Sequence, residues 1–237
     1  MRPQALLSAQ DVTAGYGAAP VISKVSVDAV PGEVTLVIGP NGAGKSTLIK
    51  ALNGELELMS GSVLLNGEDI SRCSEDQRAA RGLGYVPQSR DVFGSLTVAE
   101  NLQMGGYRLP RDLAAERVSE IFDRFPSLAR LRKRQAQTLS GGQRRLVEIM
   151  RCLMQSPRVL LLDEPMVGVA PHLVQRISGD CARISASGVA IVIVEHALEV
   201  VEAVCDRVVV MASGQVVTEA SYAEAMSSGA VREAYFA

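Results

Sequence analysis

The chain has 237 residues, 47% of them hydrophobic and 21% charged, with a formal net charge of −2 at pH 7. This composition is typical of a folded protein and excludes a disordered chain. The balanced charge argues against the basic surface that general nucleic-acid binding requires, so we expect no nucleic-acid partner. The four cysteines lack Cys-x-x-Cys spacing, and the longest apolar run, at 189–194, is too short to span a bilayer. We therefore expect a cytosolic chain that would need another chain for any membrane process.

The N-terminal stretch is predicted to form an antiparallel β layer. Residues 1–30 alternate between apolar and polar side chains and are followed by a proline-glycine turn. Residues 61–70 carry an Asn66-Gly67 pair, which is typical of a tight turn between strands or at the end of a strand.

A glycine-rich segment follows the apolar run at 34–38 and precedes a helix-like stretch at 48–53. Its sequence, GPNGAGKST, matches G-x-x-x-x-G-K-[ST]. Glycines allow positive φ and bring bare N–H groups close to an anion, and the following helix N-terminus favours negative charge. Lys45 can then reach the terminal phosphates of a nucleotide, and the Ser46 hydroxyl can coordinate Mg²⁺. The predicted nucleotide-binding residues of this segment are Gly39, Pro40, Asn41, Gly42, Ala43, Gly44, Lys45, Ser46 and Thr47.

An aromatic side chain lies upstream of this loop. Tyr16, in the turn AGYG, can stack on the purine of the nucleotide. An aromatic face gains about 1–3 kcal/mol from a base. The alternative is an ordinary tyrosine in a surface turn.

Helical periodicity dominates the middle of the chain. One helix is predicted at 111–125, ended by Pro126, and a second follows LSGGQ at 139–143 and ends before Pro157. The apolar residues that mark the two helical faces are Val118, Ile121, Phe122 and Phe125 in the first, and Leu146, Ile149, Met150 and Leu153 in the second.

The remainder alternates buried apolar strands with amphipathic helices, which implies a parallel sheet covered on both faces. We expect one α/β domain over 1–237. Its nucleotide-binding core is formed by 1–88 and 157–220, with a helical subdomain at 89–156 and a C-terminal helical tail at 221–237. The predicted elements are strands at 34–38, 83–88, 159–164 and 189–196, helices at 171–185 and around Leu198, Val201 and Cys205, and a hairpin at 207–219 about Ser213-Gly214.

Polar side chains stand at the ends of three predicted strands, on the edge where open α/β sheets bind ligands. Asp163 can hold Mg²⁺ through water, and Glu164 can orient the attacking water or accept its proton. Gln88 can reach the metal and that water, and His196 can donate a hydrogen bond to the γ-phosphate. The alternatives are a helix-entry cap for the two acids, a surface glutamine and a structural histidine.

LSGGQ, at 139–143, is a second glycine-rich loop that opens a helix, so it too can bind an anion. One chain then has two phosphate-binding loops but a single set of lysine and acids. We therefore expect this loop to complete the site of a second copy, in an isologous dimer with two nucleotides at the interface. The alternative is an N-capped helix and nothing more. The residues assigned to this role in trans are Ser140, Gly141, Gly142 and Gln143.

Taken together, these motifs resemble the ATP-binding-cassette (ABC) ATPase family over essentially the whole chain. The resemblance implies a P-loop NTPase fold with a mixed sheet flanked by helices, ATP and Mg²⁺ as cofactors, and a head-to-tail dimer. It also implies a transmembrane permease as partner and a peripheral place on the cytoplasmic face of the inner membrane. Segments 85–102, 163–171 and 231–237 look like the ATPase subunits of branched-chain amino acid importers, which implies a solute-binding protein as a further partner.

Some positions depart from these patterns. The broader family usually has an aspartate where this chain has Ala170, and Met166 and Val167 differ from the importer subfamily. Many members of that subfamily have an acid where Gln88 stands.

The motifs leave alternatives open for the process that hydrolysis drives. An exporter ATPase, for example for lipid or lipopolysaccharide, would share every motif. Soluble mechanical ATPases that act on DNA or ribosomes carry long coiled-coil insertions or two cassettes in one chain, and this sequence has neither. In the importer interpretation, residues 88–108, including Phe93, Leu96 and Tyr107, receive the cytoplasmic helices of the permease, and the solute can be an amino acid, urea or an amide.

Overall fold

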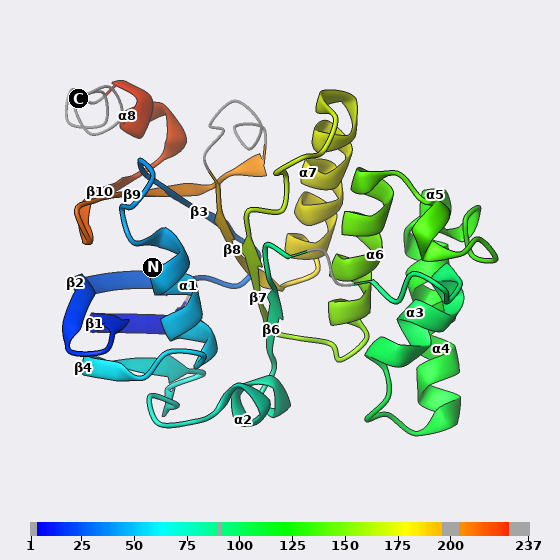
Figure 1. Ribbon diagram of the computed structural model, residues 1–237, viewed down its shortest axis with the longest axis horizontal. Coiled ribbons are helices and arrows are strands. Elements are labelled where there is room, and N and C mark those ends of the chain that lie inside the picture. Colours follow the sequence, from blue (N-terminus) through cyan, green and yellow to red (C-terminus); the bar gives the residue numbers. More distant parts are fainter. Residues whose placement is uncertain (1–3, 90–91, 196–203, 228–237) are drawn as a thin grey trace.

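The computed structural model describes residues 4–89, 92–195 and 204–227. Figure 1 shows a small sheet, a large sheet and a group of helices that lies beyond the large sheet. The elements in chain order are β1 (Leu7–Tyr16), β2 (Ala19–Ala29), β3 (Val34–Ile38), α1 (Lys45–Asn53), β4 (Leu58–Leu65), β5 (Glu68–Asp69), α2 (Glu75–Ala80), β6 (Leu83–Val86), α3 (Val98–Gly105), α4 (Arg111–Arg124), α5 (Pro126–Ala129), the 3-10 helix η1 (Ala136–Thr138), α6 (Gly141–Leu153), β7 (Val159–Asp163), α7 (Pro171–Ser185), β8 (Ala190–Val194), β9 (Arg207–Ala212), β10 (Gln215–Ala220) and α8 (Tyr222–Ser227).

The small sheet confirms the predicted antiparallel layer. Its strand order is β2-β1-β4-β5, and all of its pairings are antiparallel. Asn66 and Gly67 connect β4 to β5 with φ values of 52° and 81°. Positive φ at both positions is what a tight hairpin turn requires, and asparagine and glycine tolerate it best.

The large sheet has the order β10-β9-β3-β8-β7-β6. The pairings from β9 to β6 are parallel, whereas β10 pairs antiparallel with β9 in the hairpin predicted about Ser213-Gly214. The sheet is therefore mixed, as the family resemblance implied. Since β3, β8, β7 and β6 are parallel neighbours, the carboxyl ends of all four lie on one edge.

The large sheet is buried on both faces because alternate residues of its strands enter two separate cores. Leu36 and Ile38 pack with residues of α6 and α7, whereas Val37 packs with residues of α1 and the small sheet. Figure 1 accordingly shows α1 between the two sheets and α6 and α7 on the far side of the large sheet. The large sheet therefore stands between α1 and α6.

The middle of the chain is helical, as its periodicity predicted. Val118, Ile121 and Phe122 are buried on α4, and α6 runs from Gly141. Pro126 ends the first helix but also begins α5, because proline fits the first turn of a helix. The boundaries of the helical subdomain, core and tail stay predictions. The helix predicted around Leu198 and Val201 lies outside the described residues, while Cys205 lies in coil before β9.

Helix α2 was not predicted from the sequence, and its buried Arg78 holds the C-terminal end of α1. Arg78 is 1% exposed, and one nitrogen of its guanidinium donates to the Ala51 and Leu52 carbonyls, at 2.9 and 2.7 Å. A cation at a helix C-terminus is favoured by the helix dipole and satisfies carbonyls that lack partners within the helix. Across the residues that the structure describes, no helix is long and apolar enough to cross a membrane.

Candidate functional site

The carboxyl ends of the parallel strands bring most of the predicted site residues together. The glycine-rich loop follows β3, Gln88 comes shortly after β6, and Asp163 is the last residue of β7. Gln88 is exposed, but its side-chain amide donates a hydrogen bond to the Glu164 carboxylate. His196, which comes shortly after β8, lies outside the described residues.

The glycine-rich loop has the conformation that its residues predicted. Gly42 and Gly44 have φ values of 81° and 96°, in the region that favours glycine. At Gly39 a Cβ would lie 2.2 Å from the Met211 carbonyl oxygen, so no other residue fits there. Gly44 is also the N-cap of α1 and offers no side-chain cap. The first N–H groups of α1 are therefore available to an anion.

Lys45 lies within this loop and is 4% exposed. Its Nζ donates to the carbonyls of Gly39 and Pro40, at 2.8 and 3.0 Å. Burial lowers the pKa of Lys45, and the nearby acids Glu164, Asp163 and Glu195 oppose that effect. A largely enclosed ammonium group that bonds to neutral carbonyls is suited to receive an anion.

Asp163 is a buried acid with an unused oxygen. It is 3% exposed, and burial, followed by the charge of Glu164, raises its pKa to about 6. Its Oδ1 is buried and has no hydrogen-bond partner among the described residues. Such an oxygen fits a hard cation, and magnesium accepts few protein oxygens beside phosphate and water ligands. Ser46 on α1 and Gln88 offer further oxygens, so these residues fit Mg²⁺.

Glu164 occupies a strained backbone position directly after β7. Its φ is 45°, which is uncommon for a residue other than glycine and is typical of functional sites. Its N–H donates to the Val194 carbonyl at 2.9 Å, which fixes it to the end of β8. The carboxylate is 8% exposed and accepts from Gln88. It is thus a nearly buried, oriented acid beside the glycine-rich loop.

A third acid of the site, Glu195, was not predicted from the sequence. It is 2% exposed, and its Oε1 accepts from the Met166 N–H at 2.6 Å. It thereby holds the turn that follows Glu164. Its place next to His196, at the end of a buried strand, was the signal that could have identified it.

The loop at 139–143 lies apart from the glycine-rich loop. Ser140 is the exposed N-cap of α6, which packs on the face of the large sheet opposite α1. Its Oγ accepts from the Gln143 N–H at 3.3 Å, and the Gln143 side chain accepts from the Ser140 N–H at 3.1 Å. Gly142 is buried, and a Cβ there would lie 2.8 Å from Leu173. The N-cap of α6 that the sequence left open as an alternative is therefore present. Gly141, at the start of α6, has no side chain to cover the loop.

Tyr16 ends β1 at the tip of the hairpin with β2 and is 55% exposed. Ile22 of the same hairpin contacts Gly44, since a Cβ built on Gly44 would lie 2.5 Å from Cγ2 of Ile22. The hairpin thus reaches the glycine-rich loop, and the Tyr16 ring is accessible to a base. Its part in binding stays a prediction.

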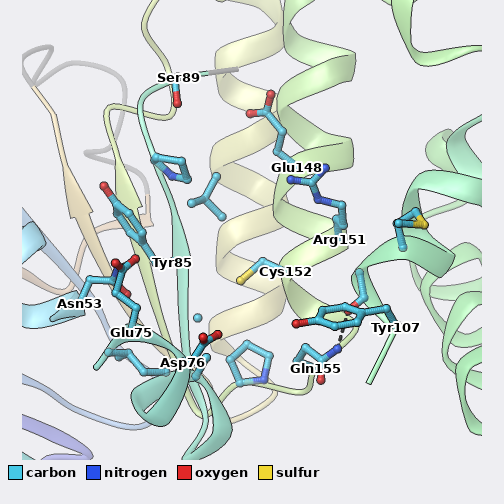
Figure 2. Close-up of a pocket in the computed structure, with 18 of the residues that line it drawn as sticks. Asn53, Glu75, Asp76, Tyr85, Ser89, Tyr107, Glu148, Arg151, Cys152 and Gln155 are labelled. Carbon is cyan, nitrogen blue, oxygen red and sulfur yellow. Dashed lines mark hydrogen bonds between the residues drawn. The ribbon is translucent and has the colours of Figure 1, made fainter. Parts of the chain in front are cut away.

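A groove of about 590 Å³ lies between α2 and β6 on one side and α3 and α6 on the other. Figure 2 shows Tyr85, Glu75 and Asp76 on one wall and Arg151, Tyr107 and Gln155 on the other. Phe93 and Tyr107 line the groove and are 44% and 69% exposed, and the Arg151 guanidinium lies 5.1 Å from the Phe93 ring centroid. Leu96 is half-buried and does not line it.

The raised pKa of Asp163 predicts a pH dependence of stability. In the folded chain the Asp163 carboxyl group stays protonated up to about pH 6, whereas in the unfolded chain it loses its proton near pH 3.8. Stability is therefore lost as the pH rises through this window. Between pH 4 and 8, the free energy of unfolding of wild type should fall by about 2.5 kcal/mol relative to that of Asp163→Asn, measured by urea denaturation in EDTA. Parallel pH profiles for the two chains would contradict this assignment.

Comparisons with known proteins agree with this geometry. The family profile described as "ABC transporter" matches residues 22–167. The chain is 35% identical over 230 residues to the high-affinity branched-chain amino acid transport ATP-binding protein BraG of Pseudomonas aeruginosa, covering 97% of this chain and 99% of that protein. It is 34% identical over 235 residues to the lipopolysaccharide export system ATP-binding protein LptB of Escherichia coli, covering 98% and 97%.

Solved structures show the same fold. A nucleotide-free ATP-binding cassette from an ABC transporter superposes with a TM-score of 0.88 at 31% identity, covering 97% of this chain and 98% of that one. The ADP conformation of MJ1267, an ATP-binding cassette of an ABC transporter, gives the same TM-score and identity, covering 98% and 99%. Members of this family bind and hydrolyse ATP, form dimers and work with permease partners. The chain belongs to the ABC transporter family and is one of its ATPases.

Proposed function

We propose that this ABC ATPase drives an importer for branched-chain or other amino acids, or for a related small solute such as urea or an amide. The supporting observation is its 35% identity to BraG over nearly the full length of both chains. Lipopolysaccharide export is the second candidate, favoured by the 34% identity to LptB. The two identities are close, so the direction of transport needs its own experiment.

The glycine-rich loop would hold the phosphates of ATP. The positive φ of Gly42 and Gly44 and the N-terminus of α1, which has no side-chain cap, support this role, and Lys45 would exchange the carbonyls of Gly39 and Pro40 for the terminal phosphates. Tyr16 would stack on the adenine. The same loop residues from Gly39 to Thr47 are those assigned from the sequence.

Ser46, Gln88 and Asp163 would hold Mg²⁺, Asp163 through water. The unused, buried Oδ1 of Asp163 is the observation that supports this assignment. When bound, the ion would supply positive charge that neutralises the phosphate oxygens. Its charge would also favour the ionised form of Asp163, which burial disfavours.

Glu164 would orient the attacking water. Its side chain is nearly buried and accepts a hydrogen bond from Gln88, and its backbone N–H is hydrogen-bonded to the end of β8. Gln88 would link this carboxylate to the metal. We assign His196 the donation of a hydrogen bond to the γ-phosphate from its sequence position alone, because it lies outside the described residues.

The loop from Ser140 to Gln143 would complete the phosphate site of a second subunit. Its position at the head of α6, across the large sheet from α1, supports a role in trans, because the sheet separates it from the glycine-rich loop of its own chain. In its capping bond Ser140 Oγ accepts from the Gln143 N–H, so the Ser140 O–H would be able to donate to a phosphate oxygen while the cap stays in place.

The groove of Figure 2 would receive a cytoplasmic helix of the permease. Its exposed aromatic residues Phe93 and Tyr107 supply the apolar area that a partner helix can bury. We propose that 89–156 moves as a unit with that partner at the cytoplasmic face of the membrane, and that a solute-binding protein delivers the solute.

Glu164→Gln should slow ATP turnover by at least about 10²-fold, because it removes the proposed water-orienting carboxylate while retaining an oxygen that can accept from Gln88. The variant should accumulate as an ATP-bound dimer, measured by size-exclusion chromatography with MgATP. Glu120→Gln is the matched control, since Glu120 forms an exposed ion pair with Arg117 on α4. Turnover near the wild-type rate in Glu164→Gln would remove the assignment.

Mixing Ser140→Arg chains with Lys45→Ala chains should restore ATPase activity, because each mixed dimer retains one complete site. Each variant alone should be inactive, so the activity of the mixture should pass through a maximum as the ratio of the two chains is varied. Activity in mixtures that never exceeds that of either variant alone would contradict a site shared between subunits.

Import is tested by uptake in cells of the source organism. Replacing the chain by Lys45→Ala should abolish uptake of labelled leucine at low concentration and leave lipopolysaccharide at the cell surface unchanged, with Glu120→Gln as control. Normal uptake of branched-chain amino acids, together with loss of surface lipopolysaccharide, would instead establish the export function.

A further inference from the structure

One arginine on the helix that follows the signature loop at 139–143 is enclosed by the proposed catalytic segments. Arg145 lies on α6 and is 3% exposed. All three nitrogens of its guanidinium donate hydrogen bonds. The acceptors are the Pro87 carbonyl at 2.8 Å, the Asp163 carbonyl at 2.8 Å, the Pro165 carbonyl at 3.2 Å and Oε2 of Glu148 at 2.7 Å.

The three carbonyls belong to the segments that carry the proposed chemistry. Pro87 directly precedes Gln88, and Pro165 directly follows Glu164. A guanidinium is a rigid, planar fork with five N–H donors, so it fixes these backbones relative to one another and to α6. A lysine has a single nitrogen and could not reach all of them.

The charge of this arginine is balanced within the protein. Arg145 and Glu148 form an ion pair whose side chains are 4% and 3% exposed. Replacing such a pair by apolar residues is often neutral for stability, whereas removing one partner leaves a buried charge uncompensated. Stability alone therefore does not account for the pair. Glu148 also lines the groove of Figure 2, so the pair lies between the groove and the catalytic segments.

We propose that Arg145, balanced by Glu148, is a positioning residue for ATP hydrolysis. It holds the backbones of Gln88, Asp163 and Glu164 in fixed places relative to α6, the helix that begins at the signature loop. Movement of that loop on a partner's nucleotide is thereby passed to the water-orienting carboxylate of the same chain. The inference rests on the roles proposed above for Gln88, Glu164 and the signature loop.

The test separates positioning from stability in the full chain. Arg145→Met should lower the melting temperature, since it leaves Glu148 without the guanidinium, and the double variant Arg145→Met/Glu148→Leu should regain it. Both the double variant and Arg145→Lys should lose at least about tenfold in kcat, while the KM for ATP changes less than about threefold. A merely structural pair would give normal kcat once the melting temperature is restored.

Normal kcat in a double variant of wild-type stability would overturn the inference. If that variant melts early, Arg145→Lys decides, because it keeps the charge opposite Glu148, and normal kcat in it is equally contradictory. Arg117→Met/Glu120→Leu is the control, an exposed pair of the same spacing on α4 that should leave kcat unchanged. Glu164→Gln, assayed alongside, separates the two proposals. Normal turnover in Glu164→Gln would contradict the role proposed for Glu164. Slow turnover in Glu164→Gln together with normal turnover in Arg145→Lys would contradict only the positioning role of Arg145.

Discussion

The large sheet stands between α1 and α6, the helices whose N-termini we propose to bind phosphate. Its alternating residues enter two cores, and these hold α1 on one face and α6 on the other. The sheet would therefore separate a nucleotide on the glycine-rich loop from the Ser140 loop of the same chain. In our proposal a second subunit supplies that loop, so that hydrolysis and separation of the two subunits become one event.

Electrostatics at the strand ends support the proposed binding of MgATP. Asp163, Glu164 and Glu195 are all nearly buried close to Lys45. Burial and mutual repulsion raise the pKa of Asp163, so at neutral pH the ligand-free site carries charge that it solvates poorly. A divalent cation would relieve this repulsion and bring in the phosphates with it. Arg145 donates to the main-chain carbonyl of Asp163, and Oδ1 of the Asp163 carboxylate has no hydrogen-bond partner among the described residues.

The sequence predicted the parts of the site that depend on local chemistry. Gly42 and Gly44 show the positive φ expected of them, and the apolar runs before Lys45 and Asp163 form the buried strands β3 and β7. Contacts between distant segments could not be predicted. Nothing local tells that β6 lies beside β7, which is what brings Gln88 to Glu164. For the same reason Glu195 and the guanidiniums of Arg78 and Arg145 went unnoticed, since polar residues in helices or at strand ends are usually solvated.

The most direct test of the shared site is a structure of the Glu164→Gln chain with MgATP. The account predicts a dimer in which the Ser140 hydroxyl and the Gly142 N–H of one subunit contact the γ-phosphate that Lys45 of the other subunit holds. An ATP-loaded structure with the Ser140 loop in solvent, away from any triphosphate, would contradict it.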